Sequence, residues 1–234
     1  MKPPLPVQTR AFLLVCAVAG GLAVPVHAVA SPVSATLALL LGLLGLRVWR
    51  WSGLPDSIRA EAPRGLARFV QPALSLGLGL MVGLVLLAVI RLAIEPGLPA
   101  AGARIAAAGA LPLWRRAAII YVAAVGEELL FRLLLLSLIA GVTVRLLRPA
   151  EGVANRGIVW GATFLSALAF AAVHLPAWSA TGTLTVGLAL MVLALNGLGG
   201  LVFGYVFCRR GIVAAMWAHA GADCAIQLIG PLTR

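Results

Sequence analysis

The sequence places six titratable side chains within long apolar segments. They are Glu127, Glu128, Arg132, His174, His219 and Asp223. A charged side chain at the centre of a bilayer costs about 2.5–3.5 kcal/mol on insertion scales, so such residues face the protein interior, where they pair or serve a functional site. Carboxylates and imidazoles are also the side chains most used in general acid–base catalysis. The set therefore indicates a candidate catalytic site.

The spacing of these residues gives the two adjacent glutamates different tasks. Glu128 and Arg132 are four residues apart and share one helix face, which favours an ion pair. Glu127 lies about 100° further around the helix and lacks this partner. We therefore interpret Glu128 as a structural carboxylate and Glu127 as a reactive one, a candidate general base.

Two further pairs have the same spacing. Phe170 and His174 share one helix face, and His219 and Asp223 share another, with Gly221 between them allowing close approach. When the chain is followed through successive helices, Glu127, His174 and Asp223 all lie toward the same membrane face. One pocket can therefore hold both imidazoles and the acids.

These motifs resemble those of the CAAX-protease and bacteriocin-processing membrane proteins, also called the ABI or type II CAAX prenyl endopeptidase-like family. Glu127-Glu128-x-x-x-Arg132 matches the family's first motif, Phe170-x-x-x-His174 its second, and His219-x-x-x-Asp223 its third. The resemblance covers about Trp114–Gln227. Any one motif is weak evidence, but three in order in successive helices make a specific match.

The resemblance implies an intramembrane glutamic endopeptidase that needs no metal or other cofactor and takes a peptide or membrane-protein substrate. Glu127 would activate a water, which His174 helps to hold and polarise. His219 and Asp223 would face the scissile carbonyl and its developing oxyanion, with Glu128 and Arg132 as the supporting pair.

Asp223 departs from the asparagine that the better-understood prenyl endopeptidases have at this position. An amide donates a hydrogen bond to an oxyanion, whereas an ionised carboxylate repels it. Two roles stay open: Asp223 is protonated, or it orients His219 through a hydrogen bond.

Composition identifies the class of protein. Of the 234 residues, 62% are hydrophobic and only 11% are charged, and the mean hydropathy is +1.06. A soluble domain of this size cannot bury so much apolar surface. The net charge of +11 comes from bases placed between apolar runs, which excludes a nucleic-acid-binding face and indicates a lipid bilayer as the partner. We predict an all-α, polytopic transmembrane helical bundle of seven to eight spans.

Seven apolar runs approach the length of a membrane-spanning helix, about 20 residues. They are Ala11–Ala30, Val33–Trp49, Val70–Ile94, Ala117–Leu147, Ile158–Leu175, Leu184–Cys208 and Ile212–Ile229. An eighth, Gly97–Leu113, is interrupted by Arg104, and we expect it to cross or re-enter the membrane because the family fold resembles an eight-helix bundle. We divide this integral membrane domain into N-terminal helices with a basic loop (1–113) and catalytic core helices (114–234).

The span count decides which membrane face the site approaches. Basic residues flanking spans are enriched on the cytoplasmic side. With seven spans and the N-terminus inside, the rule gives twelve basic residues inside and five outside, and the site approaches the outer face. With eight spans the split is ten to six, and the site approaches the cytoplasm, where CAAX-type proteases of the family process prenylated tails.

Two other classes of function remain open. Two histidines with carboxylates are plausible zinc ligands, which would make the chain a zinc-dependent membrane protease. The buried charges would also suit a transporter, or a non-catalytic membrane scaffold or immunity protein. The high Ala, Gly and Arg content indicates a GC-rich bacterial genome, hence a bacterial inner membrane and a peptide or membrane-protein tail as substrate in preference to a prenylated protein.

Some residues have a simpler interpretation. We interpret the tryptophans, Trp178 among them, as interfacial or packing residues. Glycines such as Gly77, Gly79 and Gly83 are expected to let helices pack closely.

Overall fold

The computed structural model describes residues 31–54, 67–149, 152–179 and 184–233, and every regular element in these ranges is helical. The helices are α2 (Ser31–Trp51), α3 (Ala67–Val89), α4 (Pro99–Ala108), α5 (Leu113–Glu128), α6 (Ser137–Leu147), α7 (Arg156–Ala172), α8 (Leu175–Ser179), α9 (Val186–Arg210) and α10 (Ile212–Cys224). Short π-helical segments follow three of them, η2 (Ile90–Ile94) after α3, η3 (Leu129–Leu136) between α5 and α6, and η4 (Ala225–Ile229) after α10, before the 3-10 turn η5 (Gly230–Leu232).

The predicted all-α membrane bundle is confirmed. Five helical stretches of the described chain are long and apolar enough to cross a bilayer: Phe69–Ile94, Leu113–Leu147, Arg156–Ser179, Val186–Arg210 and Ile212–Leu232. Each coincides with a predicted apolar run. The predicted run Val33–Trp49 lies within α2, a helix of 21 residues. The run Ala11–Ala30 lies outside the described residues, so the count of seven to eight spans stays approximate.

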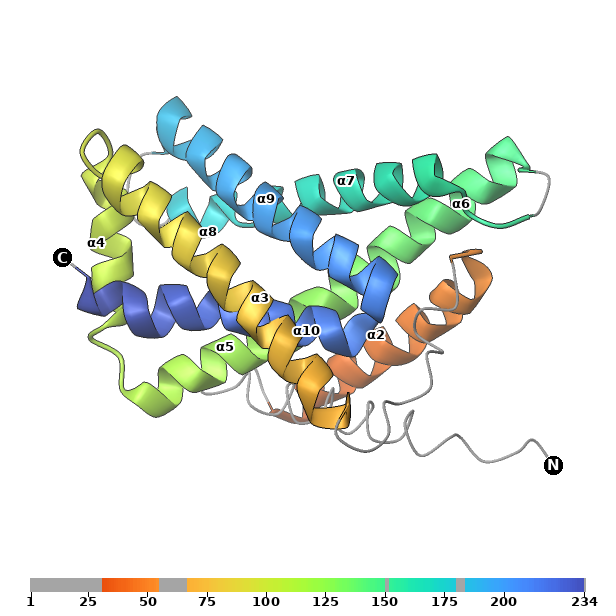
Figure 1. The fold of residues 1–234 in the computed structure, drawn as a ribbon, viewed down its shortest axis with the longest axis horizontal. Helices are drawn as coiled ribbons and strands as arrows, with labels where there is room; N and C mark the ends of the chain where they lie inside the picture. Colours follow the sequence, from red (N-terminus) through yellow and green to blue (C-terminus); the bar gives the residue numbers. More distant parts are fainter. Residues whose placement is uncertain (1–30, 55–66, 150–151, 180–183, 234) are drawn as a thin grey trace.

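Of the two outcomes expected for Gly97–Leu113, crossing or re-entering the membrane, the structure excludes the crossing. Its helix, α4, has only 10 residues. At 1.5 Å per residue it extends about 15 Å, half the thickness of the hydrocarbon core. Pro99 begins the helix, and the chain turns at Gly109–Pro112 before α5. The segment therefore ends on the face of the bundle where it began, beside the C-terminal end of α10 (Figure 1).

Glycines let α3 and α10 pack with their backbones in contact. Gly79 lies against the backbone carbonyl of Ala218, and Gly221 lies against that of Leu76. No side chain fits at either position without moving a helix. Because Gly83 lies against Ala222 one turn further along, the two helices run in the same direction. This contact fixes the helix that carries His219 and Asp223.

Replacing Gly79 by alanine is expected to destabilise the protein by about 1–3 kcal/mol, the usual cost of overpacking. The new methyl group would meet the Ala218 carbonyl and push α10 away from α3. Gly77→Ala is the matched control, because no atom lies within 4 Å of the position its methyl group would take. Thermal unfolding in detergent measures the difference, and equal melting temperatures for the two variants would contradict this packing.

The helices α7 and α9 pack against each other and run antiparallel. Gly200 of α9 lies against Ala167 and Phe170, and Gly204 lies against Thr163. The α5–η3–α6 rod passes between this pair and α2. Its buried leucines, such as Leu129, are part of the central apolar core. Many large apolar side chains remain exposed on the outer faces of the helices, as expected for surfaces that contact lipid.

Candidate active site

Glu127 and Glu128 are the last two residues of α5, where the helix changes to the π-helix η3. A π-helix is wider than an α-helix and is rare in proteins, but where one occurs it frequently lies at a functional site. Despite the change, Arg132 remains beside Glu128, with Nη1 3.3 Å from Oε1. The predicted pair of Glu128 and Arg132 is thus present in the structure.

The Glu128–Arg132 pair is completely enclosed. The exposed fraction of the side chain is 0% for Glu128 and 1% for Arg132. Arg132 also donates from Nη2 to the Gly200 carbonyl at 3.2 Å, and its guanidinium lies 4.5 Å from the Phe170 ring centroid. Buried charges need such partners, because desolvation is otherwise too costly.

His219 is held between Glu128 and two aromatic rings. Its Nδ1 lies 2.9 Å from Glu128 Oε1, so the Nδ1–H donates a hydrogen bond to this carboxylate. The ring stacks on Phe203, with centroids 4.6 Å apart, and meets Phe170 edge-on. Its Nε2 therefore points away from Glu128, 3.7 Å from Glu127 Oε2 and 3.7 Å from Asp223 Oδ2.

His174 lies in the turn after α7 and approaches Glu127. Its Nδ1 lies 2.7 Å from the Phe170 carbonyl oxygen. A carbonyl oxygen only accepts, so Nδ1 carries the proton, and Nε2 of the neutral ring is left as an acceptor. That Nε2 lies 4.0 Å from Glu127 Oε2. The Phe170 ring, 4.8 Å away, supports the imidazole.

Glu127 is therefore the point at which the motifs meet. The structure brings its carboxylate toward both Nε2 atoms, and Asp223 lies beside the second. Its side chain is 32% exposed, whereas that of Glu128 is 0% exposed. Of the two glutamates, interpreted from the sequence as one structural and one reactive carboxylate, Glu127 is the one that lines the cavity.

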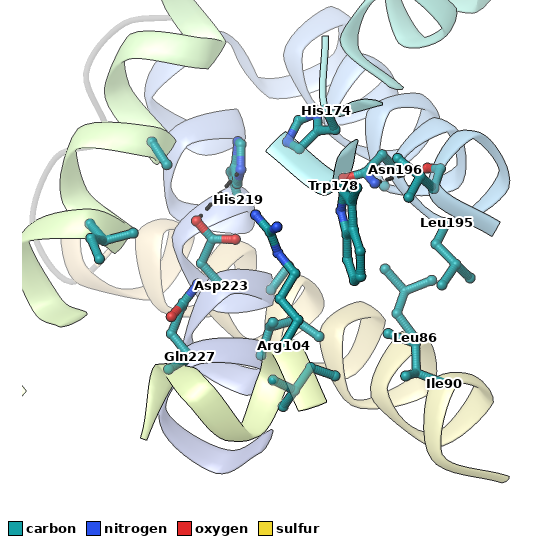
Figure 2. Close-up of a pocket in the computed structure, with 18 of the residues that line it drawn as sticks. Leu86, Ile90, Arg104, His174, Trp178, Leu195, Asn196, His219, Asp223 and Gln227 are labelled. Atoms are coloured by element: carbon teal, nitrogen blue, oxygen red, sulfur yellow. Dashed lines mark hydrogen bonds and ion pairs between the residues drawn. The ribbon is translucent and has the colours of Figure 1, made fainter. Parts of the chain in front are cut away.

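A cavity of about 610 Å³ opens onto these groups. Glu127, His174, His219 and Asp223 all line it, together with apolar side chains such as Leu86 and Leu195. Figure 2 shows His219 and Asp223 on one wall and His174 and Trp178 opposite them. Its volume falls within the range of ligand-binding pockets, about 300–1,000 Å³.

Five other polar or aromatic residues that line this cavity were not predicted as site residues: Arg104, Trp178, Asn196, Phe203 and Gln227. Arg104 reaches in from α4, donates to the Ala177 carbonyl at 2.6 Å and lies 4.5 Å above the Trp178 ring (Figure 2). Asn196 and Gln227 also line the cavity. Asn196 could have been found by extending the search for polar groups in apolar runs from charged residues to amides. Arg104 and Trp178 carry no motif, and only the fold brings them to the site.

Within the described ranges, no group of three or more His, Cys, Asp or Glu residues has the arrangement of a metal site. The distances of 3.7 and 4.0 Å from Glu127 to the imidazoles are longer than direct hydrogen bonds. Polar atoms at this separation are commonly bridged by one water molecule.

Comparison with known proteins gives one match. The family model described as "Type II CAAX prenyl endopeptidase Rce1-like" matches residues 109–225, half of the 234-residue chain. The matched region runs from the turn before α5 into α10 and contains all three motifs. No curated protein and no solved structure matches the chain.

Proposed function

Because the chain belongs to the type II CAAX prenyl endopeptidase Rce1-like family, we propose that it is an intramembrane endopeptidase in which Glu127 activates the attacking water. The observation that supports this most strongly is the convergence of two imidazole Nε2 atoms on the Glu127 carboxylate, at 3.7 and 4.0 Å, inside one cavity. A general base must lie within one water molecule of the proton it abstracts, and these distances meet that condition.

The first step follows from the tautomer of His174. Its unprotonated Nε2 and the Glu127 carboxylate are both acceptors, so a water between them donates one hydrogen bond to each. The oxygen lone pairs then face the cavity and the scissile carbonyl. Glu127 takes the proton as the oxygen attacks the carbonyl carbon, and later gives it to the leaving amine when the peptide bond breaks.

His219 is positioned to act on the oxyanion. Its Nδ1–H donates a hydrogen bond to Glu128, which fixes the ring, so a second proton, on Nε2, would point into the cavity. We assign this N–H to the negative charge that develops on the carbonyl oxygen. Arg132 and Glu128 then act as positioning residues, and Phe170 supports both imidazoles from one side.

The geometry favours one of the two roles left open for Asp223. Since Glu128 already orients His219, a second orienting carboxylate is not needed. We propose that Asp223, whose Oδ2 lies 3.7 Å from His219 Nε2, acts in its protonated form as a hydrogen-bond donor in the cavity.

The variants Asp223→Asn and Asp223→Ala test this role. An amide donates as a protonated carboxyl does, so Asp223→Asn is expected to retain cleavage within about tenfold. Asp223→Ala is expected to lose about 10²-fold in kcat, the usual effect of removing an oxyanion donor. Rates of peptide cleavage in nanodiscs measure both variants. An equal loss in the two would show that the ionised carboxylate is needed.

The proposed activity is tested by mass spectrometry of peptides incubated with the purified protein in nanodiscs. The panel contains unmodified hydrophobic leader peptides and a farnesylated CAAX peptide, since we propose a peptide or membrane-protein tail from a bacterial inner membrane as substrate. We expect cleavage of a leader peptide. Cleavage of none by folded protein would favour a membrane scaffold or immunity protein.

The same panel separates the glutamic mechanism from a zinc-dependent one. Activity is expected to survive chelation by 1,10-phenanthroline. Loss of activity that a stoichiometric zinc ion restores would instead identify a zinc protease built on the same histidines and acids.

We propose that the chain divides at residue 113 into two parts with different roles. The four proposed catalytic residues come from 114–234, whereas Leu86, Ile90 and Arg104 of 1–113 line the cavity. The N-terminal part therefore shapes the space that a substrate enters, and the C-terminal part acts on it.

A further inference from the structure

We propose that the cavity opens on the extracytoplasmic face of the membrane and takes the apolar leader segment of an exported protein. The choice of substrate rests on the proposed peptidase function, whereas the orientation does not. The positions of the helix ends and the distribution of arginines between the two faces of the bundle support this orientation.

One face, the α4 face, is defined by contacts among helix ends. Arg91 of η2 donates to the Gly230 carbonyl at 2.9 Å, and Arg116 of α5 donates to the Gln227 carbonyl at 2.9 Å. The end of α3, the start of α5 and the end of α10 therefore meet there. Leu98 lies beside Gly187 at the start of α9, and Arg104 binds the Ala177 carbonyl of α8.

The opposite face, the arginine face, holds the remaining helix ends. Arg145 of α6 donates to the Trp51 carbonyl at 2.9 Å, and the Ala154 amide donates to the Gly53 carbonyl at 2.9 Å. These contacts join the α6–α7 connection to the end of α2. The start of α10, with the end of α9 before it, lies on this face too, because α10 runs antiparallel to α5. Figure 1 shows α4, α8 and the C-terminus at one end of the bundle, and the α6–α7 connection at the other.

The chain does not cross from one face of the bundle to the other through α4. Leu98 at its beginning contacts the start of α9, and Gly109 at its end lies against Pro231, just after α10. Both contacts belong to the α4 face. The chain therefore enters and leaves α4 on one side of the membrane, and Arg115 and Arg116 lie on the same side as Arg91.

The arginines are divided unequally between the faces. In the described part of the chain, eight belong to the arginine face by their position in the helices: Arg47, Arg50, Arg68, Arg145, Arg148, Arg156, Arg209 and Arg210. Four belong to the α4 face: Arg91, Arg104, Arg115 and Arg116.

The arginine side chains of the two faces also differ in their exposure. In the parts of the chain where side chains are described, Arg47, Arg50, Arg145, Arg148, Arg156, Arg209 and Arg210 of the arginine face are exposed. Arg91, Arg104, Arg115 and Arg116 of the α4 face are half-buried. Three of these four donate to backbone carbonyls of neighbouring helix ends. Most arginines of the α4 face thus bind within the protein, whereas those of the arginine face are exposed, although Arg145 also donates to the Trp51 carbonyl.

Exposed arginines beside short connections mark the cytoplasmic side, where anionic lipids also attract them. The arginine face is therefore cytoplasmic and the α4 face is extracytoplasmic. The cavity lies toward the α4 face, since Arg104, Ala107 and Trp178 line it. Its substrates must present the scissile bond to that side.

This orientation limits the chemistry of the substrate. A leader segment with its N-terminus in the cytoplasm places its C-terminal half in the outer half of the bilayer, at the level of this cavity. Apolar side chains of the peptide fit the walls formed by Leu86, Ile90 and Leu195. A prenylated tail anchored in the cytoplasmic leaflet lies on the wrong side.

Cysteine labelling in intact bacterial cells tests the orientation without requiring any activity. In a variant whose three native cysteines are replaced by alanine, Ala107→Cys lies at the cavity rim and Val153→Cys lies on the arginine face; both positions are exposed. A membrane-impermeant maleimide is expected to label the first variant in intact cells and the second only after permeabilisation. The reverse pattern would overturn the proposal.

Vesicles of known orientation test the substrate side. Right-side-out vesicles are expected to cleave an added hydrophobic leader peptide, and inside-out vesicles are not. Cleavage by inside-out vesicles alone would overturn the assignment. If neither vesicle type nor detergent-solubilised protein cleaves any peptide of the panel, the proposed function and its substrate fail, while labelling still decides the orientation.

Discussion

Replacing Glu127 by glutamine is expected to slow peptide cleavage by about 10³-fold, because general-base catalysis contributes about 10²–10⁴-fold and His174, the other acceptor at the water, is assigned to hold the water and not to take its proton. The amide keeps the shape of the side chain but cannot take a proton. Because the Glu127 side chain is 32% exposed, its neutralisation is expected to leave stability nearly unchanged. Single-turnover cleavage rates in nanodiscs measure the loss.

Glu95→Gln is the control for this variant, since it makes the same chemical change outside the cavity, where Glu95 pairs with Arg91. It is expected to leave cleavage unchanged. Retention of more than about a tenth of wild-type activity by folded Glu127→Gln would exclude Glu127 as the general base.

The neighbouring substitution Glu128→Gln is expected to act on stability, unlike Glu127→Gln. It should destabilise the protein by about 3–5 kcal/mol, the cost of leaving a buried charge without its partner. Glu128 is the carboxylate that contacts both Arg132 and His219, and its exposed fraction is 0%. Thermal unfolding in detergent should show a large decrease in melting temperature relative to Glu127→Gln.

Two variants make this second prediction specific. Glu95→Gln disrupts an ion pair of the same i, i+4 spacing whose carboxylate is 33% exposed, and is expected to cost less than about 1 kcal/mol. Adding Arg132→Met to Glu128→Gln removes the unpaired charge and should restore part of the stability. If Glu128→Gln and Glu95→Gln unfold at the same temperature, the buried pair does not stabilise the fold.

The membrane-spanning helices could be predicted because a bilayer leaves a chain few choices. A run of about 20 apolar residues in lipid must satisfy its backbone hydrogen bonds within itself, and so forms a helix. The run Val70–Ile94 corresponds to the observed span Phe69–Ile94, and Leu184–Cys208 corresponds to α9. Hydropathy alone largely determines elements of this kind.

The sequence left crossing and re-entry open for the α4 segment, because composition does not reveal where a short helix turns back. Gly109 and Pro112 are ordinary signals of a turn. The expected similarity to an eight-helix bundle nevertheless favoured a crossing. The contacts of α4 with the ends of α9 and α10 keep it on one face, and such tertiary contacts cannot be read from local sequence.

The site was predictable to the extent that its residues share a helix turn. Four-residue spacing indicated the Glu128–Arg132 pair, which the structure places at 3.3 Å. The bond between Glu128 and His219 joins residues 91 positions apart and depends on the packing of α10 against α5. That bond changes the interpretation of Asp223, because it shows that His219 is oriented from elsewhere.

The central claim is that this chain hydrolyses peptide bonds in the membrane with Glu127 as the base. The most direct test is mass spectrometry of peptide termini in membranes from cells that express either the wild-type protein or Glu127→Gln at equal levels. We expect new peptide termini within or beside apolar segments, and these termini should be present only with the wild-type protein. Identical sets of termini in the two membranes, or cleavage products that persist with Glu127→Gln, would contradict it.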